Sequence, residues 1–211
     1  MNDTRVLKET FARLFVIAVQ NKTHFSSFTY QLERSAFVNK IENGKYDDYF
    51  NKSLINIFFD ITGNRITDDN SYGVYNDAYW CGYSYFEIYL RTRKPFSYIF
   101  LKLPLFKMMD IYSIFHEMDI SSLLEYFVKQ EHEKTILRLL CEKNNISLPK
   151  LSSLTGIGLA TLSKYNACDN ALYRASFQNV ARIAKCLNVP FYLFVDNNDI
   201  NESSSRFVVS K

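Results

Sequence analysis

The chain has 211 residues, which is enough for one large domain or two small ones. Apolar residues make up 47% of it and charged residues 22%, so a disordered chain is excluded and a packed core is expected. A net charge of +3 does not by itself indicate a nucleic-acid partner. Because only 6 Gly and 4 Pro interrupt the chain and no long alternating strand pattern occurs, we predict an all-α fold.

Apolar residues recur at helical spacing through the first half of the chain. The first such segment has Asp3 or Thr4 as a candidate N-cap, and Asn43-Gly44 closes the third. Residues 53–61 fit a helix or a strand, and helix is favoured because the neighbouring segments are helical. The polar residues 62–70 predict a mobile loop. The helices that we expect here span residues 3–22, 26–34, 35–43, 75–93, 96–103 and 104–115.

The helix expected at residues 75–93 is rich in aromatic side chains. Such a stripe at helical spacing is more often core than ligand site, so we predict that it packs inward. The stripe consists of Tyr79, Trp80, Tyr83, Phe86 and Leu90.

His116-Glu-Met-Asp119 gathers potential metal ligands, but neighbouring helical residues point about 100° apart and no HExxH pattern is present. Asp119 or Ser121 fits the N-cap of a following helix instead. No phosphate loop, nucleophile elbow or Cys/His dyad is visible. We therefore expect no enzymatic activity, no metal site and no cofactor.

The cysteines and the N-terminal residues indicate the cellular compartment in which we expect the protein. Cys81, Cys141, Cys168 and Cys186 show neither zinc nor disulfide spacing, and Cys141 and Cys186 are expected to be buried in helices. No apolar run follows a basic N-terminal start, and the longest apolar stretch is too short to cross a bilayer. We expect a cytoplasmic protein.

Residues 121–144 fit one continuous helix that joins two halves. The domains that we expect are residues 1–128, for dimerisation or partner binding, and residues 129–196, followed by a tail at 197–211. The tail is polar and then apolar, which fits a disordered end or an added strand.

The segment from Ile146 to Tyr165 predicts two short helices joined by a tight turn. Ser147 is a good N-cap, Thr155-Gly156 ends the first helix, and Gly158 begins the second. Leu151 and Leu154 are expected on one side of the first helix. In the second helix the spacing places Leu162 and Tyr165 inward and points Ala160, Ser163, Lys164 and Ala167 away from the core.

This segment resembles the helix-turn-helix of the lambda-repressor/Cro-like (XRE-type) DNA-binding family. Residues 136–145 are similar to the family's first helix, and residues 176–194 resemble its capped fourth helix, the following turn and its closing fifth helix. The likeness covers about residues 130–195 and implies a five-helix domain that binds duplex DNA as a homodimer.

The resemblance also implies a set of DNA-binding residues. Gly158 would begin the recognition helix, whose base-facing positions are Leu159, Ala160, Ser163 and Lys164. Phosphate contacts are expected at Ser147 and Lys150, at the start of the preceding helix, and at Tyr173 and Arg174, in the loop after the recognition helix. The chain departs from the family at Leu148, Leu159, Asn166 and Cys168, where the family usually has glutamine, a polar base reader, glutamate and glycine.

The charge distribution agrees with this assignment. Residues 129–195 hold nine Lys/Arg and four Asp/Glu, whereas the other residues hold 16 Lys/Arg and 18 Asp/Glu. The positive surplus thus lies in the segment that would face phosphates, although a surplus of this size also arises by chance.

Two classes of function follow. The first is a transcriptional regulator, a repressor acting at its own or a neighbouring promoter. The second is an antitoxin or inhibitor whose N-terminal half binds a protein target, while the DNA-binding half serves autoregulation. The N-terminal half is loosely similar to modules of bacterial mobile-element and toxin–antitoxin regulators. Clustering of the acids Asp47, Asp48, Asp68, Asp69 and Asp77 beside exposed tyrosines would favour the second class.

Overall fold

The structure, a computed structural model, describes residues 2–21, 23, 25–66 and 75–194. Every regular element within these ranges is helical, so the predicted all-α fold is confirmed for them. The chain divides into two compact units, Met1–Tyr126 (unit 1) and Phe127–Lys211 (unit 2). None of the described helices is both long and apolar enough to cross a lipid bilayer.

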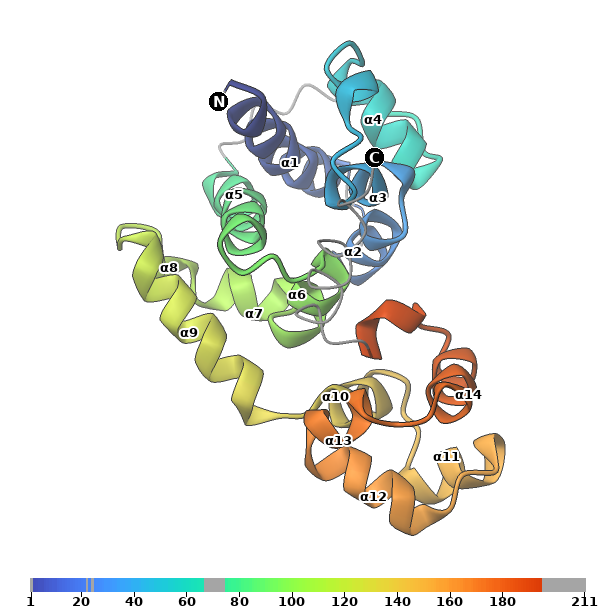
Figure 1. Ribbon diagram of the computed structural model, residues 1–211. Helices are drawn as coiled ribbons and strands as arrows, with labels where there is room; N and C mark the ends of the chain where they lie inside the picture. Colours follow the sequence, from blue (N-terminus) through green and yellow to red (C-terminus); the bar gives the residue numbers. More distant parts are fainter. Residues whose placement is uncertain (1, 22, 24, 67–74, 195–211) are drawn as a thin grey trace, which may run out of the picture. The chain divides into compact units, whose positions relative to one another are not determined.

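Unit 1 is built from short helices around two long ones, α1 and α5 (Figure 1). Asp3 lies within the first turn of α1, so the expected cap there is wrong. Ser53 caps α4 by accepting from the backbone N–H of Asn56, which supports helix rather than strand at this segment. The elements are α1 (Asn2–Gln20), α2 (Phe25–Glu33), α3 (Ala36–Glu42), the 3₁₀ turn η1 (Asp47–Tyr49), α4 (Leu54–Thr62), α5 (Asn76–Thr92), α6 (Phe96–Lys102), α7 (Leu105–Asp110), α8 (Tyr112–Phe115) and α9 (Ile120–Glu133), which runs across the boundary between the units.

Helices α1 and α5 approach each other closely at a glycine. A Cβ atom on Gly82 would lie 2.7 Å from the Cα atom of Ala12, which is too close for any side chain. Around this crossing the Phe11 ring stacks on the Phe96 ring with centroids 4.6 Å apart, and Phe96 stacks on Tyr89 at the same distance. The core of unit 1 is thus largely aromatic.

The close approach at Gly82 decides which face of α5 is buried. Of the aromatic stripe predicted to be core, only Phe86 is buried, and the other four residues are half-exposed, so that prediction is wrong for them. The buried residues of α5 are Ala78, Cys81, Gly82, Ser84, Tyr85, Phe86, Ile88 and Tyr89. Helical spacing alone does not distinguish two adjacent faces that are both rich in apolar residues.

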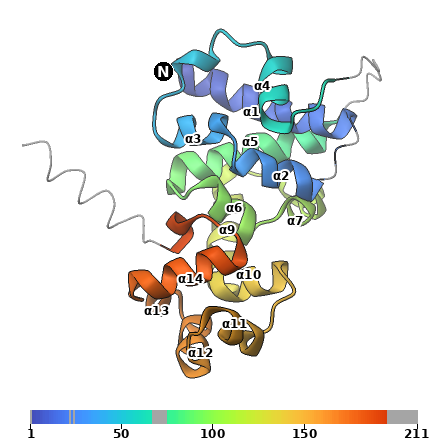
Figure 2. The same cartoon turned by 90° about the vertical axis from the view of Figure 1, so that its right-hand side faces the viewer.

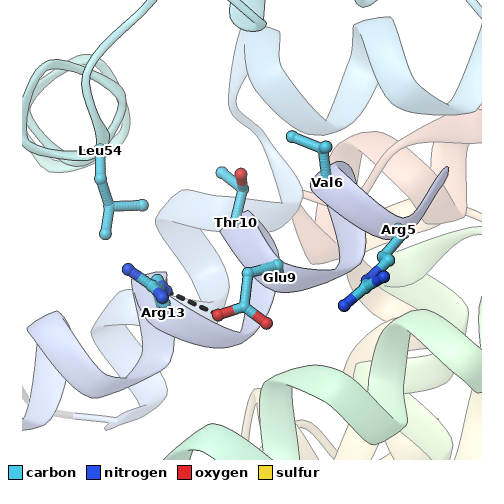
Figure 3. Close-up of a pocket in the computed structure, with 6 residues that line it drawn as sticks. All are labelled: Arg5, Val6, Glu9, Thr10, Arg13 and Leu54. Carbon is cyan, nitrogen blue, oxygen red and sulfur yellow. Dashed lines mark hydrogen bonds and ion pairs between the residues drawn. The ribbon is translucent and has the colours of Figure 1, made fainter. Parts of the chain in front are cut away.

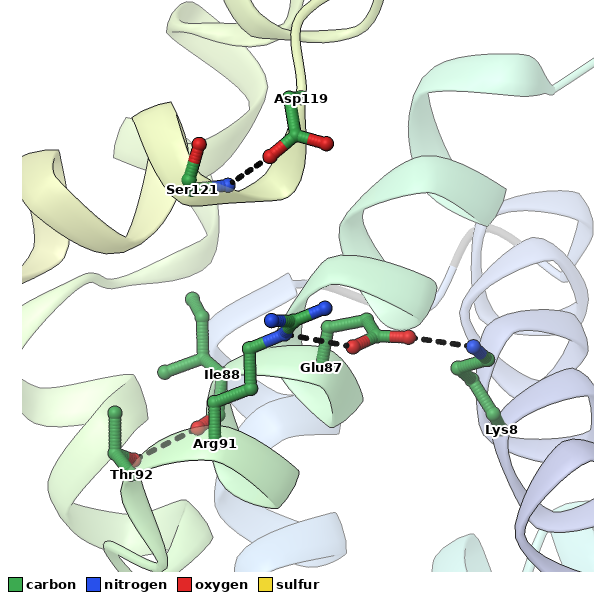
Figure 4. Close-up of polar contacts among 7 residues, drawn as sticks. All are labelled: Lys8, Glu87, Ile88, Arg91, Thr92, Asp119 and Ser121. Atoms are coloured by element: carbon green, nitrogen blue, oxygen red, sulfur yellow. Dashed lines mark hydrogen bonds and ion pairs between the residues drawn. The ribbon is translucent and has the colours of Figure 1, made fainter. Parts of the chain in front are cut away.

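A chain of charged groups links α1 to α5 (Figure 4). The Nζ atom of Lys8 lies 2.5 Å from one carboxylate oxygen of Glu87, and the other oxygen lies 3.4 Å from Nε of Arg91. Burial acts to lower the pKa of Lys8, but hydrogen bonds with Glu87 and Tyr83 outweigh it and raise that pKa. Lys8 therefore stays charged within the helix pair.

The predicted helix over residues 121–144 is wrong, because α9 ends at Glu133 and α10 begins at Ile136. Thr135 caps α10 by accepting from the N–H of Arg138, and its hydroxyl donates to the carbonyl of Asn166 at 2.9 Å. The carboxylate of Asp169 accepts from the N–H of Ile136 at 2.7 Å. The start of α10 is therefore fixed by groups more than thirty residues away, which a local pattern does not reveal.

Unit 2 packs α11 against α12 and α14, and α10 against α12 and α13. Its buried centre is aliphatic, with Leu151, Leu162 and Ile183 fully enclosed. The predicted tail at 197–211 lies outside the described residues. The elements are α10 (Ile136–Lys143), α11 (Leu148–Thr155), α12 (Leu159–Ala167), α13 (Asp169–Tyr173), α14 (Phe177–Leu187) and the 3₁₀ turn η2 (Phe191–Phe194).

Candidate nucleic-acid interface

The start of α11 presents a polar cap beside a lysine. The hydroxyl of Ser147 accepts from the N–H of Lys150 at 3.4 Å, and Pro149 occupies the first turn, where a missing N–H is harmless. Both Ser147 and Lys150 are exposed. A capped helix start with an adjacent lysine is the arrangement that attracts a phosphate.

A tight turn joins α11 to α12, and both views show the two helices side by side (Figure 2). Gly156 ends α11 with φ of +69°, a conformation that glycine adopts without strain. The hydroxyl of Ser152 donates to the carbonyl of Ile157 at 2.6 Å, and the Ile157 side chain is buried. The turn is therefore fixed both by this hydrogen bond and by the buried Ile157 side chain.

Leu151 and Leu154, which were expected on one side of α11, differ in burial. Leu151 is buried, whereas Leu154 is 53% exposed, and Thr155 takes the second inward position. The Thr155 hydroxyl donates to the carbonyl of Leu151 at 2.7 Å, so its polar group is satisfied in the interior. The two inward residues, Leu151 and Thr155, are four positions apart rather than three, so Leu154 is left exposed to solvent.

Helix α12 has one buried and one open face. Leu162 and Tyr165 point into unit 2, and the Tyr165 hydroxyl accepts from the side-chain amide of Asn179 at 3.1 Å. This contact fixes α12 on α14. The open face carries all four residues predicted to contact bases, each of them exposed: Leu159, Ala160, Ser163 and Lys164. Gly158, the N-cap of α12, is exposed as well.

Of the two residues predicted in the loop after the recognition helix, Tyr173 lies in a helix instead. It ends the short helix α13, and Arg174 is the C-cap, in the turn that follows. Arg174 is exposed, whereas Tyr173 is half-buried. Because α13 packs against α12, Arg174 lies in the turn after an element that contacts the open helix.

Cations in unit 2 fall into two groups. Lys134 and Arg138 both pair with Glu142, at 2.8 and 3.3 Å, and the hydrogen bond from Lys134 chiefly lowers the pKa of that carboxyl group. A second group, all exposed, forms no ion pair with any residue that the structure describes: Lys129, Lys150, Lys164, Arg174, Arg182 and Lys185. Apart from Lys129 on α9, these cations lie on α11, α12 and α14 and at the end of α13.

Arg182 is a candidate that the sequence reading missed. Its guanidinium lies 4.0 Å from the position that a Cβ on Gly156 would take, so a cation from α14 reaches the turn between α11 and α12. The sequence showed a basic residue on a helix, but only the packing of α14 on α11 brings it to the turn.

The other residues considered as candidates for metal binding or catalysis have structural surroundings. The carboxylate of Asp119 accepts from the N–H of Ser121 at 2.8 Å and so caps α9, as predicted. His116 is exposed and stacks on Tyr112. Within the described ranges, no group of three His, Cys, Asp or Glu side chains is arranged to hold a metal ion. Cys141 is buried as expected, whereas Cys186 is only half-buried.

Comparison with known proteins returns nothing that resembles the chain: no family model, no curated protein and no solved structure matches it. The interpretation of the open face of α12 therefore depends on the residues and geometry given above.

Proposed function

We propose that this protein is a sequence-specific DNA-binding transcriptional regulator, a repressor acting at its own or a neighbouring promoter. In this proposal α10, α11, α12, α14 and η2 form a lambda-repressor-like DNA-binding domain, with α13 as an addition between its third and fourth helices. The capped start of α11, the glycine turn and the contact of Tyr165 with α14 support this assignment.

The observation that carries the proposal is the open face of α12. A helix that reads the major groove needs one face exposed to the base edges while the other face is held by the domain, and a face without negative charge avoids repulsion from the phosphates. In α12 the free face bears Gly158, Leu159, Ala160, Ser163 and Lys164, and no acidic residue occurs in the helix.

The chemistry of this face favours particular bases. Lys164 can donate to the O6 and N7 atoms of guanine, and Ser163 can donate or accept. Leu159 and Ala160 offer apolar contact to the methyl group of thymine. We therefore propose a site in which guanine lies close to thymine-rich steps, with most readout in the major groove.

Phosphate contacts would set the position of the helix. Ser147 and Lys150 at the start of α11 supply a backbone donor site and a cation, and Arg174 supplies a second cation beyond α12. Tyr173 is the remaining residue that we assign to phosphate contact. A homodimer would place two such units on a two-fold symmetric site.

Binding to duplex DNA from the region upstream of the protein's own coding sequence tests the proposal, with excess random DNA as competitor and a salt series. We expect specific retention that weakens steeply with salt, because phosphate contacts release counterions. Equal binding to specific and random duplexes would contradict sequence-specific regulation.

The alternative of an antitoxin or inhibitor gains no support from the acids proposed to mark it. Asp48 pairs with Lys40 at 2.5 Å, and Asp77 accepts from the N–H of Ala78 at the start of its own helix. Asp68 and Asp69 lie outside the described residues. A protein partner of unit 1 has to be argued from another surface.

A further inference from the structure

An open groove of 510 Å³ runs along the exposed side of α1, beside the start of α4 (Figure 3). Val6 is 43% exposed and Leu54 is half-buried, so the groove has apolar side chains accessible to solvent. Its lining consists of Arg5, Val6, Glu9, Thr10 and Arg13 from α1 and Leu54 from α4.

Two arginines mark the ends of the groove. Arg5 and Arg13 are eight residues apart, which is about 12 Å along a helix axis. Figure 3 shows Arg13 on the side of Leu54 and Arg5 at the far end, with Glu9 between them. Both arginines are exposed.

Glu9 balances one of these two positive charges, so the groove keeps an excess of one. One of its oxygens accepts from Nε of Arg13 at 2.7 Å, and the other accepts from the hydroxyl of Tyr79. The hydrogen bond from Tyr79 is the largest cause that lowers the pKa of Glu9, so the carboxylate is charged but already engaged on both oxygens. Arg5 forms no ion pair with a described residue, and the terminal amino groups of Arg13 point away from its bond to Glu9.

We propose that this groove binds an acidic amphipathic helix of a partner protein. An apolar side chain would lie on Val6 and Leu54, and two carboxylates about two helical turns apart would pair with Arg5 and Arg13. Charge complementarity defines the partner as acidic.

A small-molecule ligand fits the groove less well. Small-molecule sites enclose most of the surface of their ligand. Here five of the six lining residues come from the outer side of one helix, and the groove is open along its length. Such a surface covers only one side of a ligand. This suits a helix of a folded partner, whose opposite face is buried in the partner itself.

The probe is a labelled, alanine-rich helical peptide with two glutamates eight residues apart and a leucine midway, titrated with the full chain and followed by fluorescence anisotropy. The matched control peptide has lysines in place of the glutamates. We expect the glutamate peptide to bind and the lysine peptide not to bind. Arg5→Glu should weaken binding at least about tenfold, because it removes one charged contact and adds a carboxylate that repels the peptide. Arg65→Glu, an equal charge change at an exposed site outside the groove, should leave binding unchanged.

Failure to bind the glutamate peptide, equal binding of both peptides, or an equal loss with Arg65→Glu would each overturn the proposal. Trp80, the only tryptophan of the chain, lies on α5 in unit 1 and reports by its fluorescence that each variant is folded. No DNA is present, so the result is independent of the proposed regulatory function.

Discussion

The two units differ in how their charged side chains are paired. In unit 1 the charged groups at the core turn toward each other or toward the backbone: Lys8 pairs with Glu87, and the carboxylate of Glu42 accepts from the N–H of Phe96 at 2.7 Å. In unit 2 the carboxylate of Glu142 pairs on the surface, and Lys150 and Lys164 have no carboxylate among the described residues. The charges at the core of unit 1 thus hold its elements together, whereas Lys150 and Lys164 on the surface of unit 2 are available to an anion.

The largest difference that this contrast predicts is in pH dependence. Burial raises the pKa of Glu42 to about 7, although the hydrogen bond from Phe96 opposes the shift. The folded state then binds the proton more tightly than the unfolded state, so the stability that Glu42 contributes is fully present below pH 4.5, and up to about 3 kcal/mol of it is lost as the pH rises to 7. Denaturant unfolding followed by Trp80 fluorescence measures this loss, and Glu42→Gln should remove it.

Glu142 is the control in unit 2, because its pKa is lowered rather than raised. Its contribution is present above the ordinary carboxyl pKa and is lost as the pH falls. Glu142→Gln should therefore leave the unfolding of unit 1 between pH 4.5 and 7 unchanged. A Glu42→Gln variant with the same pH dependence as the parent would contradict the role given to burial.

The second prediction concerns the crossing of α1 and α5. Glycine to alanine in a helix ordinarily stabilises a protein, but a Cβ on Gly82 would meet the backbone of Ala12. We expect Gly82→Ala to lower the free energy of unfolding of unit 1 by about 2 kcal/mol, as overpacking does. Thermal unfolding followed by Trp80 fluorescence measures the change, and a gain in stability would show that the helices are not in close contact.

The smallest expected effect is at the start of α11. Lys150→Ala should weaken binding to all duplexes alike, by about 1 kcal/mol, and reduce the salt slope by about one phosphate contact. Lys45→Ala, at an exposed lysine of unit 1, is the matched control and should change neither quantity. A loss confined to one DNA sequence would assign Lys150 to base contact instead.

Much of the fold could be predicted from local patterns. The caps at Ser147 and Ser176 and the glycine at 156 mark helix ends by the chemistry of one or two residues. Helix α13 was missed because five residues are too few to show a period. The break before α10 was missed because Asp169, distant in sequence, caps it.

The candidate site likewise has features that the local sequence predicts and features that it does not. The spacing of Leu162 and Tyr165 was enough to predict which face of α12 is open. The exposure of Leu154 and the position of Arg182 were not predicted, because both depend on how α14 packs against α11. Properties of one helix could be predicted from the sequence, and properties of a helix pair could not.

The most direct test of the central claim is the ratio of affinities for the best duplex and for random DNA, measured for the parent and for Lys164→Ala. If Lys164 contacts a guanine, the ratio should fall by an amount equivalent to about 1–3 kcal/mol, with little change in binding to random DNA. An unchanged ratio would contradict the assignment of the open face of α12 to the major groove.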